Sequence, residues 1–310
     1  PDEVVAHLVA LHSAGAQRCV AGMRRIRPSA MNEINVATEA GSPSSPRPLE
    51  VERRRIDCGE VTLDCALAGD PARPLVVLLH GFPESWYSWR HQIPVLAEHY
   101  RVAVPSLRGY GNSDRPKDVK SYEIPHLTGD VRGLVRALGY EDAAIVGHDW
   151  GGGISWAFAI DHPDVCRKLA VCNCPHPAIF AKSVFANPRQ LLRSWYMFFF
   201  QIPRLPEWVL TRNNMAALER GFRDMVVRKD REVFTDEDLR EIKRSFEQPG
   251  AATAAVNYYR AQFRNRTALT RYSLETRIKC PTLLIWAEDD VALGKELTVG
   301  TDALVDAPFS

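Results

Sequence analysis

The sequence predicts an α/β fold in which a mainly parallel β-sheet is covered by helices and interrupted by an inserted helical segment. Apolar, strand-like runs alternate with helical stretches from Leu49 onward, and this alternation is typical of a parallel sheet. The pattern stops between about Pro175 and Tyr272, where aromatic residues are frequent and no strand is indicated. With 310 residues and 45% hydrophobic content, the chain can bury one large core that carries this insertion.

Seven segments have the short apolar runs expected of strands. They lie at residues 51–56, 61–66, 75–79, 102–104, 143–146, 169–172 and 282–286. The first two are close enough in sequence to form a hairpin, and residues 75–79 are continuously apolar, as in a strand buried on both faces. Residues 128–138 place their apolar side chains on one helical face. We therefore expect a helix there, leading into the strand at 143–146.

The same pattern divides the chain into four segments. Residues 1–50 are predicted to be a disordered leader and linker, because the stretch from Gly41 to Pro48 is rich in Ser and Pro. Residues 51–174 form the first part of the core, residues 175–272 a helical cap, and residues 273–310 the second part of the core. Ligands of open α/β sheets bind at the carboxyl ends of the strands, where such a cap would cover them.

Composition restricts the partners of the chain. Its 39 Lys and Arg against 38 Asp and Glu leave a net charge of +1 without a basic block, so we expect a small uncharged organic substrate and no nucleic acid. The seven cysteines form no CxxC pair, which favours free thiols and a reducing, cytoplasmic location. The apolar runs are too short to span a bilayer. We expect no cofactor and no metal.

The candidate nucleophile lies within residues 143–160. Small apolar residues predict a buried strand before Gly147 and a helix after Gly152. Together with Gly151, these glycines flank Asp149, so the backbone can make the tight strand-to-helix turn that presents a nucleophile. The alternative is an aspartate that only caps the helix, but the small residues on both sides of Asp149 argue against it.

An aspartate at this turn suits a particular kind of reaction. With an ordinary pKa of about 4, its carboxylate is ionised at neutral pH and needs no base before it attacks. Saturated carbons with a strained or good leaving group are its natural targets, so epoxides and alkyl halides fit and peptides do not. Attack would leave an alkyl ester on Asp149 that water must cleave.

Three motifs occur in order: His80-Gly-Phe-Pro-Glu84, Arg108-Gly-Tyr-Gly-Asn-Ser-Asp114 and Gly147-His-Asp-Trp-Gly-Gly152. With them, the chain resembles the epoxide hydrolases of the α/β-hydrolase superfamily over roughly residues 50–300. The resemblance implies a hydrolase that converts an epoxide and water to a vicinal diol through an ester on Asp149. It also implies an oxyanion hole formed by the backbone N–H groups of Phe82 and Trp150.

The resemblance further implies two cap tyrosines that donate hydrogen bonds to the epoxide oxygen. The matching segments are residues 195–201 and 257–260, which nominate Tyr196 and Tyr259. A phenol is protonated at neutral pH, so it can protonate or stabilise an opening alkoxide. The alternative is that both tyrosines only pack within the cap.

Four more residues are expected to contact the substrate, either in the loop of the first motif or beside Tyr196: His80, Pro83, Trp195 and Phe199. For the imidazole of His80 we favour the alternative of a structural histidine that hydrogen-bonds to the backbone.

The acid of this family follows the strand after the cap, where Asp290 matches better than Asp289. Some dehalogenases carry the acid one strand earlier, but this chain has Asn173 there, and an amide cannot hold a charged imidazolium. The histidine that acts as the base in this family lies beyond the acid, whereas all nine histidines of this chain precede Asp290. Among them, we expect His148 to point away from the nucleophile and His176 to be structural.

The missing histidine predicts a truncated chain without the last strand, the histidine loop and the last helix. Residues 282–286 would then be an uncovered apolar edge strand, and such an edge favours aggregation. We therefore expect poor solubility.

Three alternatives remain open. A haloalkane dehalogenase would use the Trp150 indole on the halide, but Phe82 and Glu84 differ from that family and two cap tyrosines suit an oxyanion better. A fluoroacetate dehalogenase would carry arginines at the positions of Trp150 and Gly153. A non-catalytic binding protein on this scaffold would account for the missing histidine.

Overall fold

Seven strands form one sheet in the order β1-β2-β4-β3-β5-β6-β7. The computed structural model describes residues 51–224, 234–265 and 271–310, so the predicted leader at residues 1–50 lies outside the described residues. β1 pairs antiparallel with β2 and β2 with β4, while all other neighbours are parallel, which confirms the predicted mainly parallel α/β fold. The strands are β1 (Glu52–Asp57), β2 (Thr62–Ala68), β3 (Leu75–Leu79), β4 (Arg101–Pro105), β5 (Ala143–His148), β6 (Cys166–Cys172) and β7 (Thr282–Ile285).

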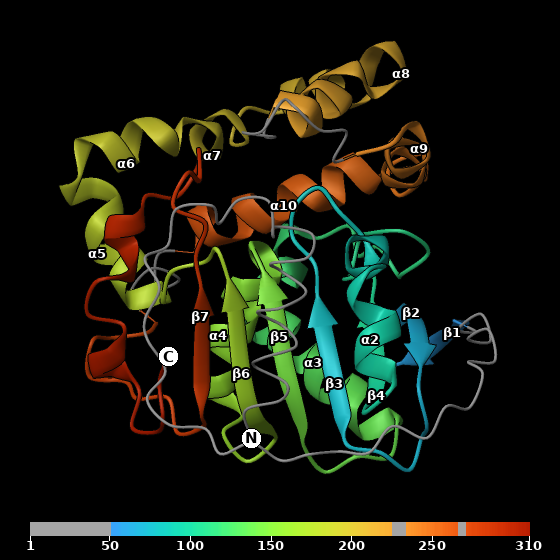
Figure 1. Ribbon diagram of the computed structural model, residues 1–310. Coiled ribbons are helices and arrows are strands. Elements are labelled where there is room, and N and C mark those ends of the chain that lie inside the picture. The colour runs from blue at the N-terminus through green and yellow to red at the C-terminus, as the bar shows by residue number, and fades with distance from the viewer. Residues whose placement is uncertain (1–50, 225–233, 266–270) are drawn as a thin grey trace, which may run out of the picture.

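The helices fall into two groups. Between the strands up to β6 lie α2 (Gln92–Ala97), α3 (Ile124–Ala137) and α4 (Trp150–Asp161), together with the 3₁₀ turns η1 (Trp86–Trp89) and η2 (Val119–Tyr122). Between β6 and β7 lie α5 (Pro177–Ala186), α6 (Pro188–Arg193), α7 (Trp195–Phe199), α8 (Leu205–Asp224), α9 (Asp236–Arg244) and α10 (Ala251–Arg264), here called the inserted helices. The 3₁₀ turns η4 (Lys295–Thr298) and η5 (Asp302–Leu304) follow β7. In Figure 1 the arrowheads of the parallel strands β3, β5, β6 and β7 point toward α10, and α6, α7 and α8 lie farther from the sheet.

The sheet separates two apolar cores, because alternate residues of a strand face opposite sides. Leu75, Val77 and Leu79 of β3 share a core with residues of α3 and α4. Val76 and Leu78 share the other core with residues of α2. All five residues are buried, which explains why β3 reads as a continuous apolar run in the sequence.

The outer edge of β7 is paired, so the prediction of an uncovered edge strand was wrong. The backbone N–H groups of Thr282 and Leu284 donate to the carbonyls of Pro308 and Ser310 at 2.9 Å each. The N–H of Ser310 donates back to Thr282 at 3.1 Å. Residues 308–310 run parallel to β7 and satisfy its edge, which removes the reason for expecting aggregation at this strand.

The structure also bears on membrane insertion and disulfides. Within the described residues, no helix combines the length and the apolar character needed to cross a bilayer. The six cysteines of the described residues are free. Two of them, Cys166 and Cys280, are buried neighbours with their Sγ atoms 3.7 Å apart.

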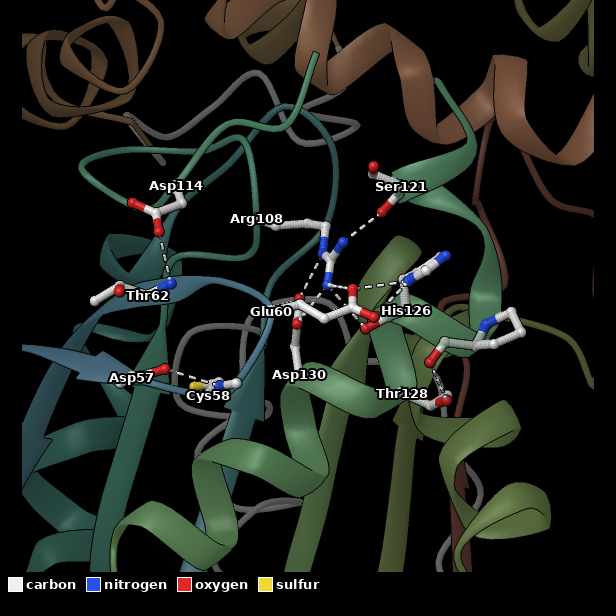
Figure 2. Close-up of polar contacts among 12 residues, drawn as sticks. Asp57, Cys58, Glu60, Thr62, Arg108, Asp114, Ser121, His126, Thr128 and Asp130 are labelled. Atoms are coloured by element: carbon white, nitrogen blue, oxygen red, sulfur yellow. Dashed lines mark hydrogen bonds and ion pairs between the residues drawn. The ribbon is translucent and has the colours of Figure 1, made fainter. Parts of the chain in front are cut away.

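Arg108 is only 1% exposed, and its guanidinium hydrogen-bonds to three parts of the core (Figure 2). It donates to both carboxylate oxygens of Asp130 on α3, at 2.6 and 2.5 Å. It also donates to the carbonyl of Ser121 at 2.5 Å and to Glu60, before β2, at 3.3 Å. Burial raises the pKa of the Asp130 carboxyl, and Arg108 opposes that rise. The buried charge is therefore compensated by a partner and by hydrogen bonds.

The substitution Asp130→Asn should lower the free energy of unfolding by about 3–5 kcal/mol. It removes the buried partner of Arg108 and leaves only the exposed carboxylate of Glu60, at 3.3 Å. Urea denaturation measures the loss. Glu237→Gln is the matched control, since its ion pair with Arg240 is exposed to water and should contribute little. Equal losses in the two variants would contradict the role assigned to the buried pair.

Candidate active site

Asp149 stands at the turn between β5 and α4, which confirms the predicted strand-to-helix turn. Its backbone has φ 50° and ψ −118°, a conformation that is costly for a residue with a side chain. Close packing requires glycine nearby, because a Cβ on Gly151 would lie 2.2 Å from the carbonyl oxygen of Leu79. A Cβ on Gly147 would lie equally close, at 2.2 Å, to the Gly151 carbonyl oxygen. The glycines thus let two backbone segments meet beside Asp149.

The two N–H groups predicted to form an oxyanion hole both contact the Asp149 carboxylate. The N–H of Phe82 donates to Oδ1 at 2.7 Å, and the N–H of Trp150 hydrogen-bonds to the same side chain. Burial raises the pKa of Asp149 above its ordinary value, while the charge of His148 and both N–H donors oppose that rise. The carboxylate is therefore oriented by its backbone partners while it faces a pocket.

This pocket encloses about 180 Å³, below the usual size of a site for drug-sized ligands. Tyr196 of α7 and Tyr259 of α10 line it together with Asp149, and the two rings lie 5.8 Å apart. The other lining residues are mostly apolar: Ile124, Trp150, Gly153, Ala157, Cys174, Pro175, Pro177, Phe180, Met197, Gln262, Phe263, Tyr272 and Leu293. The structure therefore brings the predicted nucleophile and both predicted tyrosines into one cavity.

Both tyrosines are proton donors at neutral pH. Burial raises the pKa of Tyr196 and Tyr259 above the ordinary value of 10, and the charge of Asp149 raises each further. A side-chain hydrogen bond with Trp150 opposes this rise at Tyr259. A negative charge that developed on a ligand oxygen near these phenols would therefore meet two hydrogen-bond donors.

Neighbouring residues of α10 hold Tyr259 in place. The hydroxyl of Tyr258 donates to the backbone carbonyl of Arg108 at 2.8 Å, which anchors the helix on the core. The guanidinium of Arg260 forms an ion pair with Glu207 of α8 at 2.5 Å, which anchors it among the inserted helices. Three consecutive side chains of α10 thus contact the core, the pocket and the inserted helices, in that order.

Asp290 lies in the loop after β7 and accepts three hydrogen bonds. Asn173 Nδ2 donates to Oδ2 at 2.7 Å, and the N–H groups of Ala292 and Leu293 donate to Oδ1 at 2.8 Å each. Asn173 occupies the position of the acid in some dehalogenases, and here it orients the carboxylate of Asp290. The second choice for the acid, Asp289, is exposed.

No histidine of the described residues lines the pocket. Burial alone would lower the pKa of His148, but Glu84, whose Oε2 lies 3.4 Å from Nδ1, raises it to about 9. His148 is therefore protonated at neutral pH and cannot act as a base. His176 caps α5 by accepting the N–H of Ala178 at 3.3 Å, and burial lowers its pKa to about 4.

The structure does not bring the four further predicted substrate contacts, His80, Pro83, Trp195 and Phe199, into the pocket lining. His80 is fully buried and structural: its Nε2 accepts the N–H of Leu107 at 2.9 Å, and burial lowers its pKa to about 4. Trp195 is 63% exposed. Successive helical residues differ in direction by about 100°, so Trp195 and its neighbour Tyr196 point to different sides of α7.

Two features escaped the sequence reasoning. One is the Glu84–His148 pair, although Glu84 belongs to the motif that contains Phe82 and His148 to the motif that contains Asp149. The other is Cys174, whose side chain lines the pocket. Burial and the charge of Asp149 raise the pKa of the Cys174 thiol well above its ordinary range, so it stays protonated and does not compete as a nucleophile. Within the described residues, no cluster of side chains is placed to hold a metal ion.

A family model described as the alpha/beta hydrolase fold matches residues 74–296. The chain is 41% identical to epoxide hydrolase 4 of Mus musculus, over 78% of its own length and 67% of that protein. It is 39% identical to epoxide hydrolase 1 of Caenorhabditis elegans, over 80% of its own length and 61% of that protein. The chain belongs to the epoxide hydrolases of the α/β-hydrolase superfamily.

The solved structures agree with this epoxide hydrolase assignment. The fold is similar to the crystal structure of a Bacillus megaterium epoxide hydrolase in complex with an inhibitor, with a TM-score of 0.72 and 30% identity. The match covers 84% of this chain and 90% of that chain. The chain spans only 61–67% of the length of the two relatives named above.

The turn at Asp149 predicts opposite effects of alanine at two neighbouring glycines of α4. Gly151→Ala should destabilise the protein by about 1–3 kcal/mol, because its Cβ would collide with the backbone of β3. Gly153→Ala should be neutral or stabilising by up to about 1 kcal/mol, because the nearest atom, Cys174 Sγ, lies 3.8 Å from the new Cβ. Thermal and denaturant unfolding measure the stability of both variants. Equal effects would contradict the close approach described here.

The Glu84–His148 pair predicts a pH-dependent stability. The pKa of His148 is raised from 6.5 to about 9, so its contribution is complete below pH 6.5 and is lost as the pH rises through about 9. The pKa of Glu84 is lowered from 4.5 to about 2, so its contribution is present above pH 4.5 and is lost as the pH falls toward 2. Water screens the pair, because 41% of the His148 side chain is exposed.

Denaturant titrations at pH 6.5 and pH 9 test this expectation. Glu84→Gln should reduce the fall in unfolding free energy between the two pH values, because His148 then has no carboxylate to keep it charged. Glu98→Gln, at an exposed position, is the control and should leave the fall unchanged. An unchanged fall in Glu84→Gln would show that the pair does not set the pKa of His148.

Proposed function

We propose that this chain opens small epoxides by attack of the Asp149 carboxylate on a ring carbon. The observation that carries the proposal is the pocket in which this carboxylate faces the protonated phenols of Tyr196 and Tyr259. The carboxylate supplies a nucleophile, and the phenols supply donors for the epoxide oxygen. The mostly apolar lining suits a small uncharged organic substrate. The names of the relatives support the same chemistry.

In the proposed reaction a new bond joins an Asp149 oxygen to the substrate carbon, while the carbon–oxygen bond of the epoxide breaks. The released alkoxide takes a proton from Tyr196 or Tyr259 and becomes a hydroxyl group. Water then attacks the ester carbonyl, and the oxygen that gains negative charge faces the N–H groups of Phe82 and Trp150. The proton that the attacking water loses returns to the phenolate left on Tyr196 or Tyr259. The products are a vicinal diol, the regenerated carboxylate and the neutral phenol.

We also propose that residues 175–272 act as a cap on a core made of residues 51–174 and 273–310. Tyr196 and Tyr259 both come from the inserted helices, whereas the nucleophile comes from the core. A pocket built from both parts would exclude water when a substrate is bound. The free thiols suit a reducing, cytoplasmic location.

The second half-reaction needs a water molecule activated by a base, and a positioned base contributes about 10²–10⁴ in rate. All nine histidines precede Asp290 in the sequence, and none of those in the described residues lines the pocket. The carboxylate of Asp290 is already occupied by three donors. We therefore expect that a polypeptide limited to these 310 residues accumulates the ester, because its described pocket supplies no base for the second step.

Incubation with a small aryl or alkyl epoxide should add one substrate mass to the peptide that contains Asp149, with negligible diol. Asp149→Asn should abolish the adduct, because an amide does not attack. Tyr196→Phe combined with Tyr259→Phe should slow adduct formation by about 10²–10⁴. Mass spectrometry of digested protein and single-turnover kinetics give both measurements.

Tyr140→Phe is the control, because it removes a phenol on an exposed hydrogen bond outside the pocket. Multiple-turnover diol formation by that polypeptide would contradict the expected accumulation of the ester. Halide release from an alkyl halide, without an adduct from the epoxide, would favour a haloalkane dehalogenase instead.

A further inference from the structure

Exposed apolar side chains recur every three or four residues along α6, α7 and the start of α8. Figure 1 shows these elements on the side away from the sheet. Isolated exposed apolar residues are normal on a protein surface, whereas a run of large ones marks an interaction site. The members, here called the outer ridge, are 39–74% exposed: Leu192, Trp195, Phe198, Ile202, Leu205 and Trp208.

The charges along the outer ridge are almost all positive. Its arginines are exposed, and no carboxylate of the described residues forms an ion pair with them: Arg189, Arg193, Arg204 and Arg212. The guanidinium of Arg212 lies over the ring of Trp208 at 4.3 Å. Glu207 is the single acid between residues 187 and 212, and it is paired with Arg260. The ridge thus combines apolar side chains with unneutralised positive charge.

We propose that the outer ridge docks on a lipid bilayer that carries anionic headgroups. Leu, Phe and Ile side chains suit the boundary between headgroups and acyl chains, and Trp side chains prefer this interfacial level. Exposed arginines along the same segment attract the lipid phosphates. A second copy of the chain fits less well, because a symmetric dimer through this face would bring the same unpaired arginines together.

The outer ridge is continuous with the pocket. The ring of Phe198 lies 5.4 Å from the ring of Phe263, and Phe263 is both 37% exposed and part of the pocket lining. Tyr196 and Met197, which also line the pocket, stand between ridge residues in α7. A docked chain would therefore offer an apolar epoxide dissolved in the bilayer a short apolar route to Asp149. This route rests on the proposed function, whereas docking itself does not.

Flotation of the full chain with lipid vesicles tests the docking without any catalytic step. The chain should float with vesicles of phosphatidylcholine and phosphatidylglycerol, bind more weakly to phosphatidylcholine alone, and lose affinity as salt screens the arginines. Arg193→Gln with Arg212→Gln should weaken binding to the anionic vesicles about 25-fold, at about fivefold for each arginine. Leu192→Ser with Trp208→Ser should weaken it about tenfold or more.

Two double variants outside the outer ridge are matched controls. Arg132→Gln with Arg136→Gln removes two exposed arginines of α3, and Leu274→Ser with Val299→Ser removes two exposed apolar side chains. Both should bind vesicles like the parent chain, and thermal unfolding checks that every variant is folded.

Absent vesicle binding, or equal weakening in ridge and control variants, would overturn the proposal. A dimer in light scattering that the ridge variants dissociate would overturn it in favour of a second copy. Adduct formation in solution without vesicle binding would overturn docking while leaving the epoxide chemistry intact.

Discussion

The buried charge of Arg108 connects the stability of the core with the geometry of the pocket. Its guanidinium must remain with Asp130, because a buried charge without a partner costs several kcal/mol. Its backbone carbonyl is thereby fixed as the acceptor for Tyr258. The next residue of α10 is Tyr259, which lines the pocket together with Asp149. The position of a proposed proton donor thus depends on an ion pair that does not line the pocket.

Features encoded by local sequence were predictable from the residues. The continuous apolar run of β3 indicates a strand buried on both faces, and the glycines around Asp149 indicate a tight turn. The structure contains both elements. The bounds of α3 were less well predicted: the helix starts at Ile124 rather than near residue 128. There Pro125 occupies the first turn, where a missing N–H costs nothing, and apolar periodicity alone does not record this.

Beyond the residues that the family resemblance nominated, some contacts between distant segments were not predictable. The edge of β7 is paired by residues 308–310, whose sequence has no strand signal. Asn173 donates a hydrogen bond to Asp290, 117 positions away in the chain. In the sequence, the two residues had only marked two alternative positions for the acid. Adjacent aromatic residues were equally ambiguous, because only the packing of α7 decides that Tyr196 faces the pocket and Trp195 faces outward.

The two halves of the proposed reaction use opposite sides of the pocket. Alkylation places negative charge on the epoxide oxygen, and the donors for that charge, Tyr196 and Tyr259, come from the inserted helices. Ester hydrolysis places charge on an oxygen of the Asp149 group, and its donors come from the core. The N–H of Phe82 already holds Oδ1 at 2.7 Å in the free chain. The same oxygen can therefore become the carbonyl of the ester and then an oxyanion without leaving its donor, so the site needs no reorganisation there. Movement of α7 and α10 relative to the core would alter alkylation first, whereas loss of a base would alter hydrolysis alone.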